Sequence, residues 1–187
     1  MSRADVNLEA CGQVIWITGL SGAGKSTLAL AFSEELRRRR HSVVLLDGDE
    51  LRRIFGNAAS LPDSYQRDGR LALAMQYAQL CRTIAGQGHT VVIATISLFR
   101  EVHAWNRVHL PGYFEIYLKV PLEELRRRDP KGIYRRFDAG ELCSVAGLDL
   151  PIDEPDAPDW QVDFEPRRTP AALTDELLQR FYKRKLA

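Results

Sequence analysis

Cysteines are few in this sequence, and long apolar runs are absent. Only three of the 187 residues are cysteine, Cys11, Cys81 and Cys143. No C-x-x-C pair or His–Cys cluster accompanies them, so the sequence predicts neither a disulfide framework nor a metal site built on cysteine. A reducing compartment fits best, and we expect a cytoplasmic protein. No stretch is apolar for long enough to cross a bilayer, and the first residues lack the apolar core of a secretory signal.

A surplus of either charge is also missing. The chain has 26 Lys and Arg against 25 Asp and Glu, a net charge of +1, so nothing predicts general nucleic-acid binding. The run of arginines at 37–40 is interpreted as cations that complement the dipole at a helix end. An N-K-x-D motif, which reads guanine in GTP switches, is absent. At this length we expect a single domain, spanning 1–187.

A glycine-rich loop is the most informative segment that the sequence does have. Residues 19–27 read G-L-S-G-A-G-K-S-T, between an apolar run at 14–17 and a helical pattern. In this context backbone N–H groups and the positive helix end converge on phosphate oxygens. Lys25 is expected to reach the outer phosphates and Ser26 to ligate Mg²⁺. The loop residues expected to bind ATP are Gly19, Ser21, Gly22, Ala23, Gly24, Lys25, Ser26 and Thr27.

Strands and helices alternate along the chain. Strands are expected at 13–18, 42–46, 90–96, 113–120 and 160–164, and helices at 25–40, 51–55, 64–85, 101–108, 121–128 and 173–185. Apolar strands separated by helices predict an α/β fold, a parallel sheet covered by helices on both faces. Prolines break the pattern from about 129 to 166, which we interpret as a lid; a disordered insertion is the alternative.

Polar residues follow the second and third strands, at the sheet edge where ligands bind. Asp49 can hold the water of a magnesium ion or accept a proton from an attacking hydroxyl. For Asp47, a role at the nucleotide and simple capping of the next helix remain equally open. The fork of Arg52 can grip a phosphate or sulfate, and Ser97 follows the third strand.

Several motifs, in one order, resemble those of the adenylylsulfate (APS) kinases. They are D-G-D-x-[LI]-R at 47–52, A-x-I-S at 94–97, P-L-E at 121–123, R-D-x-K-G-[LI]-Y at 128–134 and G-E-[IL] at 140–142, besides the glycine-rich loop. The resemblance runs from about residue 14 to 164. It implies a P-loop NTPase-type fold and transfer of the γ-phosphoryl of MgATP to the 3′-hydroxyl of a small nucleotide such as APS. It also implies a homodimer.

The resemblance implies roles for particular residues. Lys25, Asp49 and Ser97 would carry catalysis, and Ser97 is phosphorylated in some members of the family. Ser26 and Asp49 would hold Mg²⁺, and Arg128 would join the ATP site as part of a lid that excludes water. The residues implied at the acceptor substrate are Asp47, Asp49, Arg52, Arg67, Arg70, Ile96, Ser97, Lys131 and Val145.

Two aromatic positions of the family are absent. The family reads F-S-x-x-D-R-x-x-N where this chain has Leu61 or Pro62 for the phenylalanine and Arg70 for the asparagine, and it reads F-T-G where this chain has V-A-G at 145–147. Both phenylalanines would stack on the adenine of APS, and one such stack is worth ~1–3 kcal/mol.

Their loss favours another acceptor, such as the cytidine 5′-diphosphoramidate of capsule pathways. The stretch at 94–107 also resembles that branch. Drift within a true APS kinase, with Tyr65 as the stack, stays open. The intact Lys25, Asp49 and Lys131 argue against a binding module without turnover, and the lid motif argues against a kinase of non-nucleotide alcohols.

Overall fold

Five parallel strands form one sheet. In this computed structural model, residues 12–56 and 66–185 are described. The strands are β1 (Gln13–Thr18), β2 (Val43–Asp47), β3 (Thr90–Ala94), β4 (Phe114–Lys119) and β5 (Trp160–Asp163), in the order β2-β3-β1-β4-β5. β1 lies centrally, paired with β3 on one side and β4 on the other. Its near-continuous burial is typical of a parallel sheet covered on both faces.

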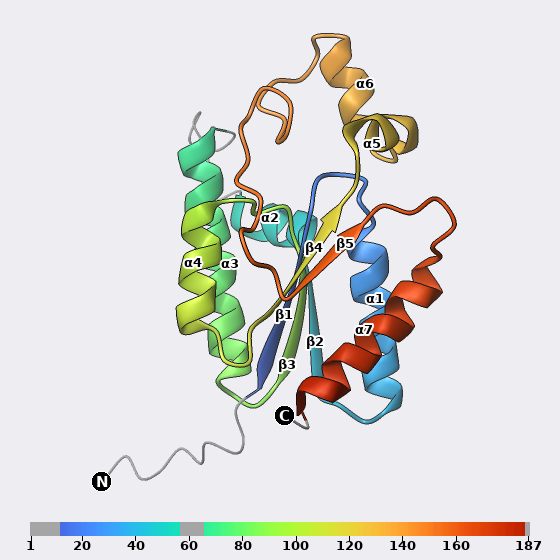
Figure 1. Cartoon of the computed structure of the whole chain (residues 1–187). Coiled ribbons are helices and arrows are strands. Elements are labelled where there is room, and N and C mark those ends of the chain that lie inside the picture. The colour runs from blue at the N-terminus through green and yellow to red at the C-terminus, as the bar shows by residue number, and fades with distance from the viewer. Residues whose placement is uncertain (1–11, 57–65, 186–187) are drawn as a thin grey trace, which may run out of the picture.

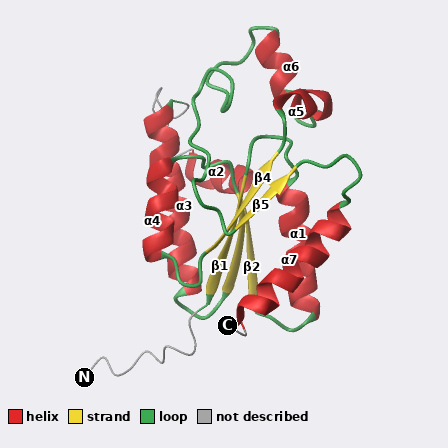
Figure 2. Ribbon diagram, viewed as in Figure 1, coloured by secondary structure: helices red, strands yellow, loops and turns green. Residues whose placement is uncertain are grey.

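Helices cover both faces of the sheet (Figures 1 and 2). α1 (Lys25–Arg38) and α7 (Pro170–Lys185) lie on one face, and α3 (Arg67–Ala85) and α4 (Arg100–His109) on the other. α2 (Gly48–Gly56) follows β2, while α5 (Leu122–Arg128) and α6 (Ile133–Asp138) stand beyond the carboxyl ends of the strands. The predicted α/β architecture is therefore confirmed.

Each face of the sheet has its own apolar core. Phe32 of α1 and Phe181 of α7 meet edge to face with ring centroids 5.5 Å apart. Trp16, Tyr77 and Cys81 belong to the second core, under α3 and α4. Burial raises the pKa of the Cys81 thiol above its ordinary value, so this cysteine packs as an inert apolar residue.

The predicted elements are found with shifted ends. The strand expected at 90–96 ends at Ala94: the N–H of Thr95 still bonds to Ile17 of β1, but the carbonyl of Ile96 accepts the Thr18 hydroxyl and Ser97 has a φ of 29°. The helix expected at 51–55 already begins at Gly48. The start of the helix expected at 64–85 lies partly outside the described residues, and α3 begins at Arg67. Not every apolar residue of α3 is buried. Leu71 and Met75 are only half-buried, whereas Leu73, Ala74 and Tyr77 are buried.

The stretch at 129–166 contains one expected and one unexpected element. The strand expected at 160–164 is β5, whereas the helix α6 was not expected. α6 escaped prediction because it is six residues long, too short to show a helical period, and lies between two glycines with positive φ, Gly132 and Gly140.

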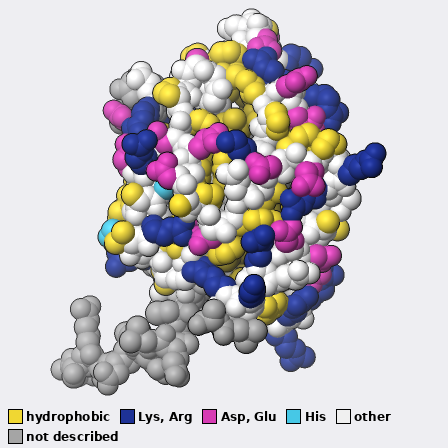
Figure 3. All heavy atoms as spheres, in the orientation of Figure 1, with side chains coloured by type: hydrophobic (Ala, Val, Ile, Leu, Met, Phe, Trp, Pro, Cys, Tyr) yellow, Lys and Arg dark blue, Asp and Glu magenta, His cyan; other side chains and the backbone are white. Residues whose placement is uncertain are grey.

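Charges of both signs are interspersed on the face drawn in Figure 3, in keeping with the near-zero net charge. Within the described part of the chain, no helix is long and apolar enough to span a membrane.

Candidate functional site

The glycine-rich loop leaves β1 at Thr18 and enters α1 at Lys25. Gly24 has a φ of 97° and Gly22 a φ of 80°, conformations that L side chains rarely adopt. A Cβ on Gly19 would lie 2.7 Å from the carbonyl oxygen of Leu118 on β4. The glycines therefore let the backbone wrap around a space at the positive end of α1.

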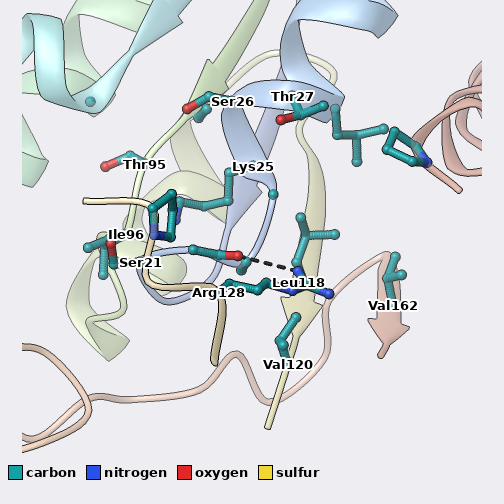
Figure 4. A pocket seen from close by; sticks show the side chains of 18 of the residues that line it. Ser21, Lys25, Ser26, Thr27, Thr95, Ile96, Leu118, Val120, Arg128 and Val162 are labelled. Carbon is teal, nitrogen blue, oxygen red and sulfur yellow. Dashed lines mark hydrogen bonds between the residues drawn. The ribbon is translucent and has the colours of Figure 1, made fainter. Parts of the chain in front are cut away.

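A cavity of about 580 Å³ opens at this loop, at the carboxyl ends of the strands (Figure 4). It brings together most of the residues that the sequence singles out: Ser21, Gly22, Ala23, Gly24, Lys25, Ser26, Thr27, Asp47, Asp49, Arg52, Ile96, Ser97, Arg128 and Lys131. Gly19, Arg67, Arg70 and Val145 do not line it. The volume suits a nucleotide-sized ligand.

Lys25 lies half-buried in the wall of this cavity. Its ammonium donates a hydrogen bond to the carbonyl oxygen of Leu20 at 2.8 Å. Burial, and secondarily the positive charge of Lys131, lower its pKa to about 8, although Asp49 and Asp47 oppose the shift. An anionic phosphate beside Lys25 would restore its preference for the charged form.

Asp47 contacts both the glycine-rich loop and the start of α2. Its Oδ2 accepts a hydrogen bond from the Ser26 hydroxyl at 2.7 Å, and its Oδ1 accepts one from the N–H of Asp49 at 2.8 Å. Burial alone would raise the pKa of Asp47, but these bonds and one from the N–H of Glu50 lower it below its ordinary value. Asp47 therefore caps α2 and also faces the glycine-rich loop, so the two interpretations of this residue are compatible.

Asp49 forms an ion pair with Lys131, which precedes α6. Ser26 is thus hydrogen-bonded to Asp47, whereas the Asp49 side chain points to Lys131 of the lid. No cluster of three or more His, Cys, Asp or Glu suited to a metal occurs in the described residues. The hydroxyl and carboxylates near the loop nevertheless suit Mg²⁺, which takes few protein oxygens and completes its shell with water and phosphate.

The segment after β3 is held in an unusual conformation. The Thr18 hydroxyl donates a hydrogen bond to the carbonyl oxygen of Ile96. The hydroxyls of Thr95 and Ser97 lie 2.8 Å apart, and Ser97 is buried with a positive φ of 29°. Strained backbone of this kind, held from several sides, clusters at functional sites.

A second, much smaller cavity of about 30 Å³ adjoins the first. Arg52, Ile96 and Ser97 line both. The others that line it are Arg70, Leu98, Phe99, Ala146, Leu150, Pro151 and Ile152. Nη2 of Arg70 donates a hydrogen bond to the carbonyl oxygen of Ser144 at 2.6 Å, so α3 is tied to the loop on the opposite wall.

Two expected substrate residues lie outside both cavities. Arg67 pairs with Glu101 at 2.9 Å and with Asp153 at 3.5 Å, and its guanidinium lies over the ring of Phe99. Val145 is buried and donates its N–H to Asp149, while its neighbour Ala146 lines the small cavity.

The sequence matches a family model described as adenylylsulphate kinase over residues 11–163. The chain belongs to the APS kinase family. It is a nucleotide kinase of the APS kinase type, and its family uses ATP.

Relatives of this APS kinase family member bear two kinds of name. A cytidine diphosphoramidate kinase of Campylobacter jejuni is 40% identical over 77% of this chain and 82% of its own. An adenylyl-sulfate kinase of Pseudomonas aeruginosa is 36% identical over 80% of this chain and 76% of its own. The Mycobacterium tuberculosis APS kinase in complex with AMPPNP and APS superposes with a TM-score of 0.78 and 32% identity, covering 90% of this chain and 96% of that one.

Several residues of this APS kinase family member were missed from the sequence. Phe164 lies just beyond β5, lines the large cavity, and has Arg128 over its ring at 4.9 Å. Arg168 lines the same cavity and pairs with Glu176. The signal for Phe164 was its place at the end of a predicted strand, at the ligand-binding edge. Arg168 carried no recognisable signal.

The predicted lid touches the phosphate loop directly. The buried Tyr134 of α6 donates its hydroxyl hydrogen to the carbonyl oxygen of Ser21 at 2.9 Å. A Cβ on Gly147 would lie 2.8 Å from the Leu20 side chain. Tyr134 closes the R-D-x-K-G-[LI]-Y motif, so a signal for its importance was present, but its partner could not be known from the sequence.

Proposed function

We propose that this protein transfers the γ-phosphoryl of MgATP to the 3′-hydroxyl of a cytidine nucleotide with an amide-terminated 5′ diphosphate. The single observation that carries the choice of acceptor is Arg70 on the wall of the small cavity, hydrogen-bonded to Ser144. The name of the Campylobacter jejuni relative, 40% identical, agrees with it.

The chemistry of the two bases supports a cytidine acceptor. Cytosine presents two adjacent acceptors, O2 and N3, which match the two donors of a guanidinium, whereas adenine presents a donor beside an acceptor, which suits an amide. The exocyclic amino group of cytosine needs an acceptor such as a carboxylate. Burial disfavours the charged form of Asp149, but N–H groups of Ser144 and Val145 and the charge of Arg70 lower its pKa. Asp149 therefore fixes the loop that Arg70 contacts, although it lines neither cavity.

The two cavities support a division of labour. The large one, with the glycine-rich loop, takes the triphosphate. The acceptor base lies beside it at the small one, whose walls must part to admit the base, since about 30 Å³ holds no more than a water molecule. Arg52, Ile96 and Ser97 line both, so they lie where the acceptor ribose and its 5′ phosphates would run. Lys25 is placed to neutralise charge on the transferred phosphoryl group.

The proton and the phosphoryl group move in opposite directions. The 3′-oxygen attacks the γ-phosphorus, the bond from that phosphorus to the β–γ bridging oxygen breaks, and ADP leaves. Asp49 accepts the proton of the hydroxyl, which requires it to exchange its Lys131 partner for the substrate. Ser26 was expected to hold Mg²⁺ with Asp49, but its hydroxyl is bonded to Asp47. Ser26 and Asp47 are therefore the residues that would hold Mg²⁺ and its water shell, and the ion would offset the charge of the phosphates.

APS is the second candidate acceptor. It is favoured by the Mycobacterium tuberculosis structure that holds APS, at a TM-score of 0.78. A homodimer stays a prediction that light scattering after size-exclusion chromatography tests.

ADP release separates the candidates when it is measured with cytidine 5′-diphosphoramidate, CDP, APS and gluconate as acceptors. We expect kcat/KM to be at least ~10-fold higher for the diphosphoramidate than for APS, the scale of one matched base contact. Phosphorus NMR of the product would place the new phosphate on the 3′-oxygen. Preference for APS would overturn the cytidine assignment, and turnover of none would favour a nucleotide-binding module.

A further inference from the structure

A carboxylate is buried near the start of β4, on the face of the sheet that α3 and α4 cover. Glu115 of β4 is 2% exposed. Its carboxylate accepts hydrogen bonds from Nδ1 of His103 at 2.6 Å, from the Tyr113 hydroxyl at 2.9 Å and from Arg107 at 3.2 Å. A buried charge is costly unless it is fully hydrogen-bonded, so this network holds its members in one arrangement. None of them lines either cavity.

His103 of α4 connects the Glu115 network to the loop at 150–153. Its Nε2 lies 3.2 Å from the backbone carbonyl oxygen of Asp153. Both ring nitrogens therefore face oxygen acceptors, and the protonated imidazole is the form that donates to both at once. The rigid imidazole ring of His103 thereby links Glu115 to Asp153.

Asp153 is fixed at all three of its polar groups. Besides the bond to His103, its N–H donates to the carbonyl oxygen of Leu98 at 3.0 Å. Its Oδ2 accepts the N–H of Arg100 at 3.1 Å and pairs with Arg67 at 3.5 Å. Arg67, expected from the sequence at the substrate, instead ties α3 to this loop.

The loop continues directly into the wall of the small cavity. Residues 150–152 form one side of that cavity, and Leu98 and Phe99 form another. The bond between Asp153 and Leu98 thus joins the two walls at their ends. How Asp153 is held sets the separation of the walls, and hence the shape of the space.

The same carboxylate fixes the other end of the loop. Arg107, which pairs with Glu115, donates to Asp159 at 2.6 Å and to the carbonyl oxygen of Ala157 at 3.1 Å. Asp159 also accepts the N–H of Glu115 at 2.8 Å. Figure 1 shows this segment running past α4 before it enters β5.

We infer that Glu115 and His103 are positioning residues for the acceptor site: they hold residues 150–153 in place as the wall of the small cavity against which the acceptor base binds. The inference rests on the acceptor site proposed above. Because the ATP cavity is built on the glycine-rich loop and the lid, these residues govern acceptor affinity without touching the donor site.

His103→Gln is the decisive variant, since an amide carries both of its donors on one nitrogen and cannot reproduce donors at the separate Nδ1 and Nε2 positions. We expect KM for the acceptor to rise about tenfold, the scale of one lost charge-assisted hydrogen bond. KM for ATP and kcat at saturating acceptor should stay unchanged. The matched control is His109→Gln on the same helix, where the exposed histidine bonds only to the carbonyl oxygen of Trp105 in its own helix. It should leave all three constants unchanged.

A milder variant and a second measurement keep the test independent of folding and of the acceptor assignment. Asp153→Asn alters a partly exposed carboxylate and should raise acceptor KM in the same selective way. Amide hydrogen exchange at 150–153 should accelerate in His103→Gln but not in His109→Gln. If no acceptor is phosphorylated, the proposed function fails while hydrogen exchange still tests the inference. The inference would be overturned if His103→Gln lowered kcat and raised KM for ATP as well, or if amide exchange at 150–153 were unchanged in that variant.

Discussion

Asp49 is the residue on which the proposed chemistry depends most. It lines the ATP cavity and pairs with Lys131. Asp49→Ala should lower kcat by at least ~10²-fold, the usual contribution of a general base. Glu50→Ala, next along α2 and exposed, is the control and should turn over like wild type. Single-turnover and steady-state ADP release measure both, and wild-type turnover by Asp49→Ala would remove it from the mechanism.

Arg70 carries the preference for the acceptor base. Arg70→Asn places an amide where the APS kinase pattern has one, and an amide matches the donor–acceptor edge of adenine. The ratio of kcat/KM for APS to that for cytidine diphosphoramidate should rise ~10-fold or more. Arg82→Asn, on an exposed turn of the same helix, is the control. An unchanged ratio in Arg70→Asn would show that Arg70 does not select the base.

Lys25 makes ATP binding depend on pH. Burial and Lys131 lower its pKa to about 8 in the free protein. Above that pH the neutral amine no longer attracts phosphate, and binding, which favours the charged form, takes up a proton. ATP affinity should therefore fall as pH rises from 7 to 9. Calorimetry in buffers of different ionisation enthalpy measures the proton uptake. Lys25→Arg stays charged throughout and should lose the uptake; uptake that persists would assign it to another group.

The glycine-rich loop and the 140–150 loop touch through one glycine. Gly147 has a φ of 82°, and a Cβ there would lie 2.8 Å from Leu20, whereas Gly140 has a φ of 72° with nothing within 4 Å. Gly140→Ala should cost ~1 kcal/mol of unfolding free energy from backbone strain alone. Gly147→Ala should cost clearly more, because it adds a clash.

Urea unfolding measures both glycine variants, and the Leu20→Ala background isolates the contact. In the Leu20→Ala background, Gly147→Ala should lower the free energy of unfolding by about as much as Gly140→Ala does. Equal costs in the wild-type background would mean that the contact between the loops contributes nothing to stability.

The helices and strands differ in how far the sequence determines them. β1 and β3 were predictable because their apolar runs are nearly continuous and bounded by turns. α6 was not, since six residues give no period. The end of β3 was misjudged because Ile96 continues the apolar pattern, although a tertiary bond from Thr18 holds its carbonyl outside the sheet.

Across the whole molecule, motif residues were easier to predict than their partners. Lys25, Ser26 and Asp49 stand in spacings fixed by phosphate chemistry, so the sequence brings them to one cavity. Arg67 stands in a family motif yet pairs with Glu101 and Asp153, residues far away in the chain. Nothing local in a sequence encodes such a pairing. The hydrogen-bond network around Glu115 could not be predicted either, because in the sequence Glu115 is only a single polar residue within an apolar strand.

The ATP cavity draws on β2, β3, β4, β5, α1, α2, α7 and the lid, so ligand binding should stabilise the molecule as a unit. At free MgATP ~100 times its Kd, the free energy of unfolding should rise ~2.7 kcal/mol, or about 5–10 °C in Tm for a chain of this size. EDTA should remove most of this gain if Ser26 and Asp47 help hold Mg²⁺. Ser26→Ala should likewise lose the Mg²⁺-dependent part, whereas Ser42→Ala, whose exposed hydroxyl bonds to His89, should keep it. A Tm gain that is equal with Mg²⁺ and with EDTA would mean that ATP binds here without the metal.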